Sequence, residues 1–319
     1  MGSRRFLLAS LTAALALTAT SAPALAKKPD PGASGERPLT PQEQAASDRK
    51  TGEAERYVAS VGASGDDLVS LACVVPLSTT TQDFEALSLE PAGDPAATQP
   101  STAEVATNDG ADVAPLACWV PQGFLAVEAR DQIFGHYCGP AVGQVIANYS
   151  WAMPAGANVF TQQRIAGWMS TDVNGGTHSW AMEFGLEQAT AGSPRRPWNW
   201  DWIVTELIDT DRDGWVGDQL DAYVRSNISG SKMPLAISVK PHDPASPSGA
   251  HLASWPVPVW SVGHWVAIYG WVGIHDGTDR ARMYFTDSSR DEGGATGKFW
   301  TPTHWFTLMI LEHTRLIVW

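Results

Sequence analysis

Apolar residues recur at helical spacing in several segments of the second half of the chain. After Cys138 they fall three or four residues apart, which predicts a helix; the positions are Val142, Val145, Ile146 and Tyr149. Residues 179–190 (SWAMEFGLEQAT) and 201–208 (DWIVTELI) are interpreted as two further helices. Another is predicted over residues 218–228, where one face carries Leu220, Tyr223, Val224 and Ile228.

Beyond residue 230 the pattern changes to short apolar runs separated by turn residues. These runs predict strands at 234–240, 264–274, 281–289, 305–310 and 315–319. The strands at 264–274 and 281–289 are joined by HDGTD, a sequence typical of a hairpin loop. Helices followed by an antiparallel sheet indicate an α+β fold, with N-terminal helices packed on a C-terminal sheet.

The first 26 residues have the organisation of a secretory signal peptide. Arg4 and Arg5 precede an apolar run, and the segment 24–26 (ALA) supplies a small-residue cleavage site. We expect cleavage after Ala26 and a secreted bacterial protein whose mature chain has no membrane span. The arginine pair leaves both the general and the twin-arginine export routes open.

Residues 27–115 differ in composition from the C-terminal two thirds of the chain. No Lys or Arg occurs between Arg56 and Arg130, a stretch that holds ten acidic residues. One-signed charge and low hydrophobicity are typical of disorder, so we interpret 27–115 as a pro-region or acidic disordered linker and 116–319 as the folded domain. Removal of the signal peptide takes away two arginines and moves the formal charge from −13 to −15. Such a charge argues against nucleic acid or an anionic membrane as a partner.

The chain has three cysteines, an odd number for an exported protein. Cys73 (LACVVP) and Cys118 (LACWVP) have matching sequence contexts, and Cys138 does not share them. One hypothesis is a Cys73–Cys118 disulfide that leaves Cys138 free. The alternative is a short duplicated motif with unpaired thiols.

Cys138 is placed where a thiol becomes reactive. It directly precedes Gly139-Pro140 and the predicted helix, so it lies where unpaired N–H groups and the helix dipole stabilise a thiolate. Addition of a thiolate to a carbonyl also needs a general base and a donor for the oxyanion. Gln132, six residues earlier, is the candidate donor together with the backbone N–H of Cys138.

His264 is the candidate base and Asp287 its partner. If Asp276-Gly277 forms a two-residue turn, His264 lies opposite Ser289, and Asp287 becomes its diagonal neighbour on the same face. A carboxylate there holds the imidazole in one tautomer. His304 is the rival base.

The ordered set Gln132, Cys138 (YCGPA), His264 (GHWVAIYGW) and Asp287 (YFTDSS) resembles the papain-like cysteine peptidases. It is most similar to the bacteriocin-processing-like branch, peptidase family thirty-nine. The resemblance covers about residues 120–319 and implies a papain-like fold, a peptide or protein substrate, acyl-enzyme chemistry and no required cofactor. Two departures, at 213–224 and 242–260, enlarge the middle of the domain and bear on substrate specificity. A non-catalytic secreted binding module on this fold and a cell-wall peptide amidase are the alternative functions.

A candidate calcium loop lies at Asp209–Asp221 (DTDRDGWVGDQLD). Asp209, Asp211 and Asp213 alternate and are followed by a turn glycine, a pattern that suits a hard cation with oxygen ligands. The twelfth position is Leu220, where such loops carry a bidentate carboxylate. The alternative is a plain Asp-Gly turn with Asp218 capping the next helix.

Overall fold

The computed structural model describes residues 36–64, 122–208, 216–246, 248–259, 263–273, 281–289 and 294–319. The chain divides into two units, Met1–Pro31 and Gly32–Trp319, and every described residue belongs to the second. The predicted signal peptide, Cys73, Cys118 and the candidate calcium ligands Asp209, Asp211 and Asp213 lie outside the described residues. Within the described part, no helix is both long and apolar enough to cross a membrane.

The helices largely follow the apolar periodicity. They are α1 (Pro41–Ser64), α3 (Cys138–Ser150), α4 (Gln162–Met169), α5 (Ser179–Thr190), α6 (Gly217–Arg225), which continues into the π-helical segment η1 (Ser226–Ser231), and α7 (Thr303–Leu311). The predictions of α3, α5 and α6 are confirmed. The sequence analysis did not predict α1, α4 or α7.

The strands of the described residues form one sheet in which every pair is antiparallel. They are β1 (Gln122–Phe124), β2 (Val204–Glu206), β3 (Leu235–Val239), β4 (His264–Val272), β5 (Arg282–Asp287), β6 (Gly297–Pro302) and β7 (Leu316–Val318). The order is β2-β7-β3-β4-β5-β6, and β1 pairs with β4. The fold is therefore a mixture of helices and an antiparallel sheet, as predicted.

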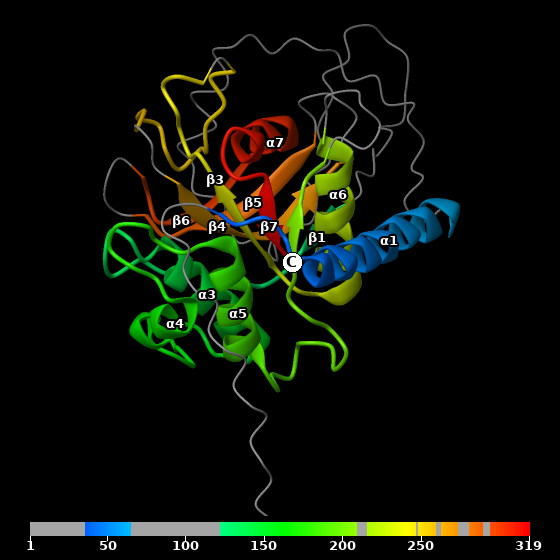
Figure 1. Ribbon diagram of the computed structural model, residues 1–319, viewed down its shortest axis with the longest axis horizontal. Helices are drawn as coiled ribbons and strands as arrows, with labels where there is room; N and C mark the ends of the chain where they lie inside the picture. The colour runs from blue at the N-terminus through cyan, green and yellow to red at the C-terminus, as the bar shows by residue number, and fades with distance from the viewer. Residues whose placement is uncertain are drawn as a thin grey trace, which may run out of the picture. The chain divides into compact units, whose positions relative to one another are not determined.

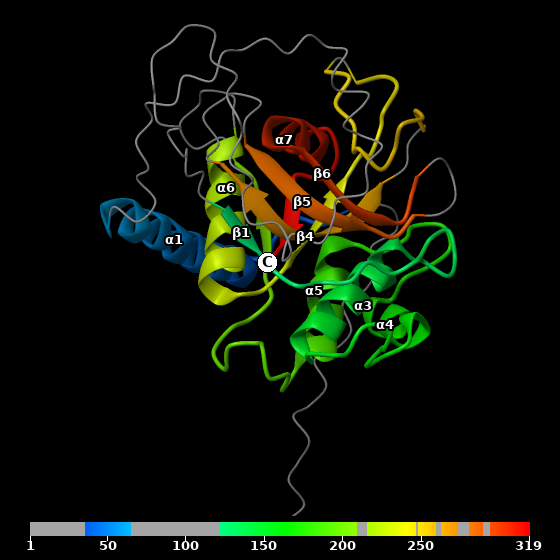
Figure 2. The ribbon, with the colours of Figure 1, turned by 180° about the vertical axis from the view of Figure 1, so that it is seen from behind.

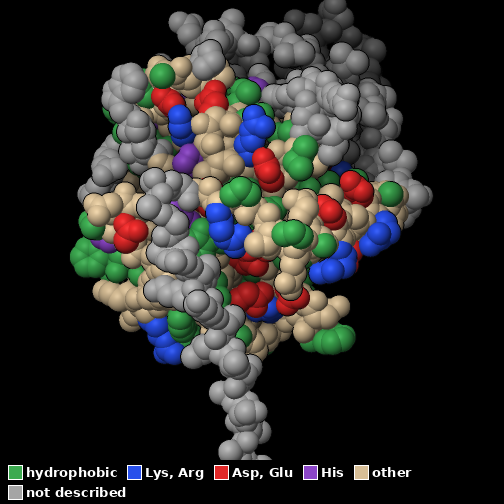
Figure 3. All heavy atoms as spheres, viewed as in Figure 1, with side chains coloured by type: hydrophobic (Ala, Val, Ile, Leu, Met, Phe, Trp, Pro, Cys, Tyr) green, Lys and Arg blue, Asp and Glu red, His purple; other side chains and the backbone are tan. Residues whose placement is uncertain are grey.

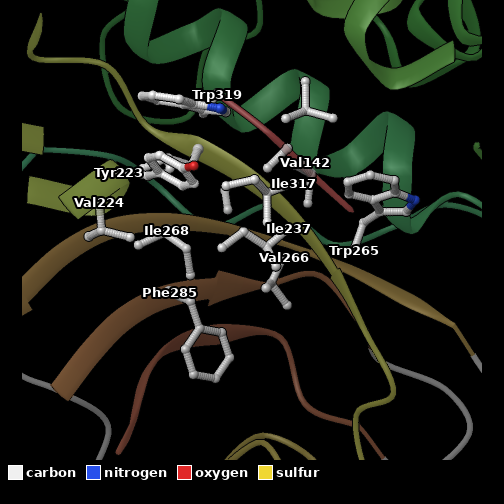
Figure 4. Close-up of a cluster of buried hydrophobic side chains, with 14 of the residues drawn as sticks. Val142, Tyr223, Val224, Ile237, Trp265, Val266, Ile268, Phe285, Ile317 and Trp319 are labelled. Atoms are coloured by element: carbon white, nitrogen blue, oxygen red, sulfur yellow. The ribbon is translucent and has the colours of Figure 1, made fainter. Parts of the chain in front are cut away.

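Helices α3, α4 and α5 gather on one side of the sheet and α7 lies on the other (Figure 1; Figure 2, from behind). Their apolar side chains form one core with the strands. Figure 4 shows Val142 of α3 in this core together with Ile237 of β3, Ile317 of β7 and Trp265 of β4. Because α3 packs on the central strands, its first residue, Cys138, is fixed relative to the sheet.

Two segments have a secondary structure that differs from the prediction. Residues 305–310 were expected as a strand and belong to helix α7, which buries Phe306, Met309 and Ile310. A short apolar run does not by itself distinguish a strand from a buried helix, although the spacing of the buried Phe306, Met309 and Ile310 is the helical one. Residues 201–208 were expected as a helix and instead contain β2, in which Val204 pairs with Val318.

Helix α1 lies inside the segment that was interpreted as a pro-region or disordered linker. It packs against α6, η1 and β2. Ala54 is fully buried, and Ser47 Oγ donates to Thr205 Oγ1 at 3.0 Å. Lys50 Nζ lies 3.9 Å from the ring centroid of Trp200 and donates to the backbone oxygens of Asp201 and Trp319. Residues 36–64 are thus attached to the folded unit. Because most of these contacts are polar, the sequence of this segment has no apolar periodicity that would have indicated the helix.

Acidic and basic side chains are interspersed over the face shown in Figure 3, and the basic ones do not gather in a single patch.

Candidate active site

Cys138 is the first residue of α3 and is only 7% exposed. Its thiol is free. The preceding Tyr137 places no side-chain cap on the helix, so the N-terminal end of α3 keeps its favourable interaction with a negative charge. The sequence prediction of a free cysteine at a helix start agrees with this placement.

The start of α3 is held close to the loop before α5. A Cβ on Gly139 would lie 2.3 Å from Thr177 Oγ1, closer than any real contact. Trp265 Nε1, from β4, donates to the backbone oxygen of the same Thr177 at 2.8 Å. Thr177 therefore contacts the residues that come directly after Cys138 and His264, and it fixes the two segments relative to each other.

His264 begins β4 and Asp287 ends β5, and their side chains meet. The His264 Nε2–Asp287 Oδ1 distance is 2.7 Å, and the two residues are 3% and 1% exposed. The strand register near the site is the expected one, with Ala267 opposite Thr286. A bulge between Ile268 and Gly270 shifts the pairing farther along.

Each carboxylate oxygen of Asp287 accepts two hydrogen bonds. His264 Nε2 and the backbone N–H of Ser289 (2.8 Å) donate to Oδ1. Ser254 Oγ (2.6 Å) and Trp255 Nε1 (2.9 Å) donate to Oδ2. Two donors on each oxygen stabilise the ionised carboxylate.

The ionisation of the pair follows from these contacts. Burial lowers the pKa of His264, but the charge and hydrogen bond of Asp287 and those of Cys138 outweigh it and raise this pKa to about 10. Burial raises the pKa of Asp287, whereas His264, Ser254 and the Ser289 N–H together bring it below its usual value. Since Nε2 of His264 is bonded to Asp287, Nδ1 is the ring nitrogen left for Cys138. The arrangement can take a proton from the thiol and hold it on the imidazole.

Gln132 lies beside the segment that comes after Asp287. Its backbone N–H donates to Ser288 O at 2.9 Å, and its side-chain Nε2 donates to Gly135 O at 3.0 Å. Ser288 Oγ donates to Gln132 Oε1 at 3.4 Å. We expected the amide of Gln132 beside the backbone N–H of Cys138; in the structure one of its two hydrogens is bound to the carbonyl of Gly135, in the loop before Cys138.

His304 lies on α7, which packs against α6, β3, β5 and β6. The interactions of His264 include Cys138, so the structure favours His264 over its rival as the neighbour of the thiol. Among the described residues, no group of three or more His, Cys, Asp or Glu side chains is arranged to hold a metal ion.

Three residues at the site were missed by the sequence analysis: Thr177, Ser254 and Trp255. Thr177 directly follows the turn that the pairing of Asp172 with Gly176 closes. Its role comes from its side chain and carbonyl, and nothing in its sequence context indicates that role. Ser254 and Trp255 lie in the 242–260 segment that was related to specificity. Their distance in sequence from Asp287 left no local signal.

The fold and site thus define a helix and antiparallel-sheet domain with a buried, hydrogen-bonded His264–Asp287 pair and a buried free cysteine, Cys138, at the start of a helix. No protein family and no curated protein matches the sequence. Among solved structures, the chain is similar to the peptidase domain of Streptococcus ComA, a bi-functional ABC transporter involved in a quorum sensing pathway. The identity is 12% and the TM-score 0.32, over 60% of this chain and 96% of that one. The functional proposal therefore rests on the site.

Proposed function

We propose that the protein is an exported, papain-like cysteine peptidase that hydrolyses peptide bonds through an acyl-enzyme. The observation that carries this proposal is the buried His264–Asp287 pair, in which Asp287 is bonded by four donors and His264 by the carboxylate, with Cys138 among the groups that raise the pKa of His264. A buried His–Asp pair costs desolvation free energy, and perturbed, buried titratable groups cluster at functional sites.

The chemistry assigns one role to each residue. The Cys138 thiol transfers its proton to His264, and the thiolate adds to the substrate carbonyl carbon. The amide of Gln132 and the N–H groups at the start of α3 donate to the oxyanion. When the C–N bond breaks, His264 returns the proton to the leaving amine, and the acyl group stays on Cys138. A water molecule, deprotonated by His264, then releases the carboxylic acid and regenerates the thiol.

Asp287 exchanges no proton in this sequence. Its Oδ1 fixes the ring of His264 with Nε2–H toward the carboxylate, and its charge stabilises the imidazolium that forms after each proton transfer. The proposed site needs no metal or organic cofactor.

Export is proposed from the signal-peptide organisation of residues 1–26. Residues 27–115 are proposed to include a pro-region, of which 36–64 pack on the folded unit through α1.

The proposal is tested with purified protein and an unfolded, disulfide-free protein substrate, with new N-termini read by mass spectrometry. We expect cleavage by the wild type that stops in Cys138→Ala and after treatment with iodoacetamide. Cleavage that persists in Cys138→Ala would contradict the proposal. Release of peptides from purified cell wall with no cleavage of the unfolded protein would favour the amidase instead.

A further inference from the structure

We infer that Ser254 and Trp255 are positioning residues that lock the rotation of the Asp287 carboxylate and thereby the orientation of His264. This inference rests on the proposed function, and it assigns a role to the 242–260 segment that reaches beyond specificity.

Both residues donate to the same carboxylate oxygen. Ser254 Oγ lies 2.6 Å and Trp255 Nε1 2.9 Å from Asp287 Oδ2, and each residue is 1% exposed. Oδ1 is bound by His264 and the Ser289 N–H. A carboxylate held at one oxygen only is free to turn about its C–C bond, whereas donors on both oxygens fix its plane.

Trp255 also covers the histidine. Its ring centroid lies 5.0 Å from that of His264, at an interplanar angle of 59°. The ring therefore excludes water from the His264–Asp287 bond, and this strengthens the interaction by lowering the local dielectric.

The loop that carries the two residues is itself held in place. Ala295 N donates to Ser254 O at 2.9 Å, and His242 Nδ1 lies 2.7 Å from Trp255 O. A Cβ on Gly294 would lie 2.7 Å from Trp255 Cε2, so the backbone approaches the indole as closely as glycine permits. The backbone that carries the two donors is thus held by hydrogen bonds and close packing.

The contacts predict a measurable change in the ionisation of Asp287. In the described part of the chain, the titratable groups that face Asp287 are His264 directly and Cys138 beyond it; Ser254, Trp255 and the Ser289 N–H are neutral donors. The Ser254 hydroxyl lowers the pKa of Asp287. Its removal is therefore expected to raise this pKa, because the ionised carboxylate loses one of its hydrogen bonds.

The test uses the proton NMR signal of His264 Nε2–H, which a bond to a carboxylate shifts downfield and which disappears in acid as Asp287 takes a proton. The assignment comes from loss of the signal in His264→Ala. In Ser254→Ala and Trp255→Phe the acid midpoint of this signal moves to higher pH. Ser246→Ala, in the same loop, and Trp305→Phe, on α7, are matched controls and keep the wild-type midpoint.

Each outcome decides one question. If the acid midpoint of the His264 signal in Ser254→Ala and Trp255→Phe equals that of the wild type, the positioning role is overturned. If Trp255→Phe fails to fold, as shown by its circular dichroism, Ser254→Ala decides alone, since it removes a single oxygen. The two proposals can also fail separately. If the midpoint shifts but Cys138 is alkylated as fast in His264→Ala as in the wild type, the peptidase proposal is overturned. The positioning of His264 by this loop then still stands.

Discussion

Replacement of Asp287 by asparagine tests the site most severely, because the two side chains have the same shape and different hydrogen-bonding capacity. Asp287 accepts from four donors. An asparagine offers one acceptor oxygen and one donor NH2 group. With its oxygen toward His264, the NH2 group faces the Trp255 N–H, which is only a donor. In the flipped orientation it faces the Ser289 N–H and forces His264 into the opposite tautomer.

The cost is therefore that of a broken buried ion pair with a donor left unsatisfied. Breaking such a pair destabilises a protein by about 3–5 kcal/mol. The pH dependence comes from both partners. The pKa of Asp287 is lowered from 3.8, so its contribution is present above pH 3.8 and is lost as the pH falls through the folded value. The pKa of His264 is raised from 6.5 to about 10, so its contribution is complete below pH 6.5 and is lost as the pH rises through 10.

The assay is urea unfolding followed by tryptophan fluorescence at pH 3, 6 and 10.5, for wild type and Asp287→Asn. The difference in the free energy of unfolding is expected to be largest at pH 6 and to shrink at both other values. Asp201→Asn, which neutralises an exposed partner of Arg196 (3.5 Å), is the control and leaves stability almost unchanged. A difference below about 1 kcal/mol at pH 6, smaller than the usual cost of an unsatisfied buried group, or one that is the same at all three pH values, would refute the reasoning.

Four further predictions concern the packing of the domain, its thiols and the candidate calcium loop. Gly139→Ala places a Cβ 2.3 Å from Thr177 Oγ1; we expect a loss of about 1–3 kcal/mol in urea unfolding and slower alkylation of Cys138, and unchanged values would contradict the close packing. Deletion of residues 36–64 removes the contacts of α1 and lowers the melting temperature; an unaltered melting temperature would favour the linker interpretation. Peptide mapping after alkylation identifies Cys138 as a free thiol, and a disulfide to either other cysteine would exclude the mechanism. Calcium raises the melting temperature relative to chelator if 209–213 is a site, and equal melting temperatures would leave a plain turn.

The pairing of His264 with Asp287 could be predicted from the sequence because a hairpin joins strands that are neighbours in the chain. Counting outward from a two-residue turn placed Asp287 diagonally from His264, and the observed pairing of Ala267 with Thr286 keeps that register at the site. The bulge before Gly270 escaped prediction, since it depends on β1: a Cβ on Gly270 would lie 2.4 Å from Phe124 Cδ1. It lies between the loop and the site: on its loop side Trp271 pairs with Met283, one residue off the predicted register, and on the site side the predicted pairing holds.

The donors to Asp287 could not be predicted in this way. Ser254 and Trp255 precede it by 33 and 32 residues, in a loop without periodicity, so only tertiary structure brings them to the carboxylate. Helix α1 escaped for a related reason. Its attachment through Lys50 and Ser47 is polar, whereas sequence patterns report apolar faces.

The most direct test of the account is the rate of Cys138 alkylation by iodoacetamide between pH 5 and 8, in wild type, His264→Ala and His304→Ala. If His264 holds the proton of the thiol, the wild type and His304→Ala react rapidly throughout this range. His264→Ala then reacts slowly, because no base takes the proton of the thiol. The double variant His264→Ala/Asp287→Asn is alkylated only a little more slowly than His264→Ala alone, because the effects of residues that act as a unit are non-additive. Equal rates in wild type and His264→Ala at every pH would show that His264 does not activate this thiol, and would contradict the peptidase assignment.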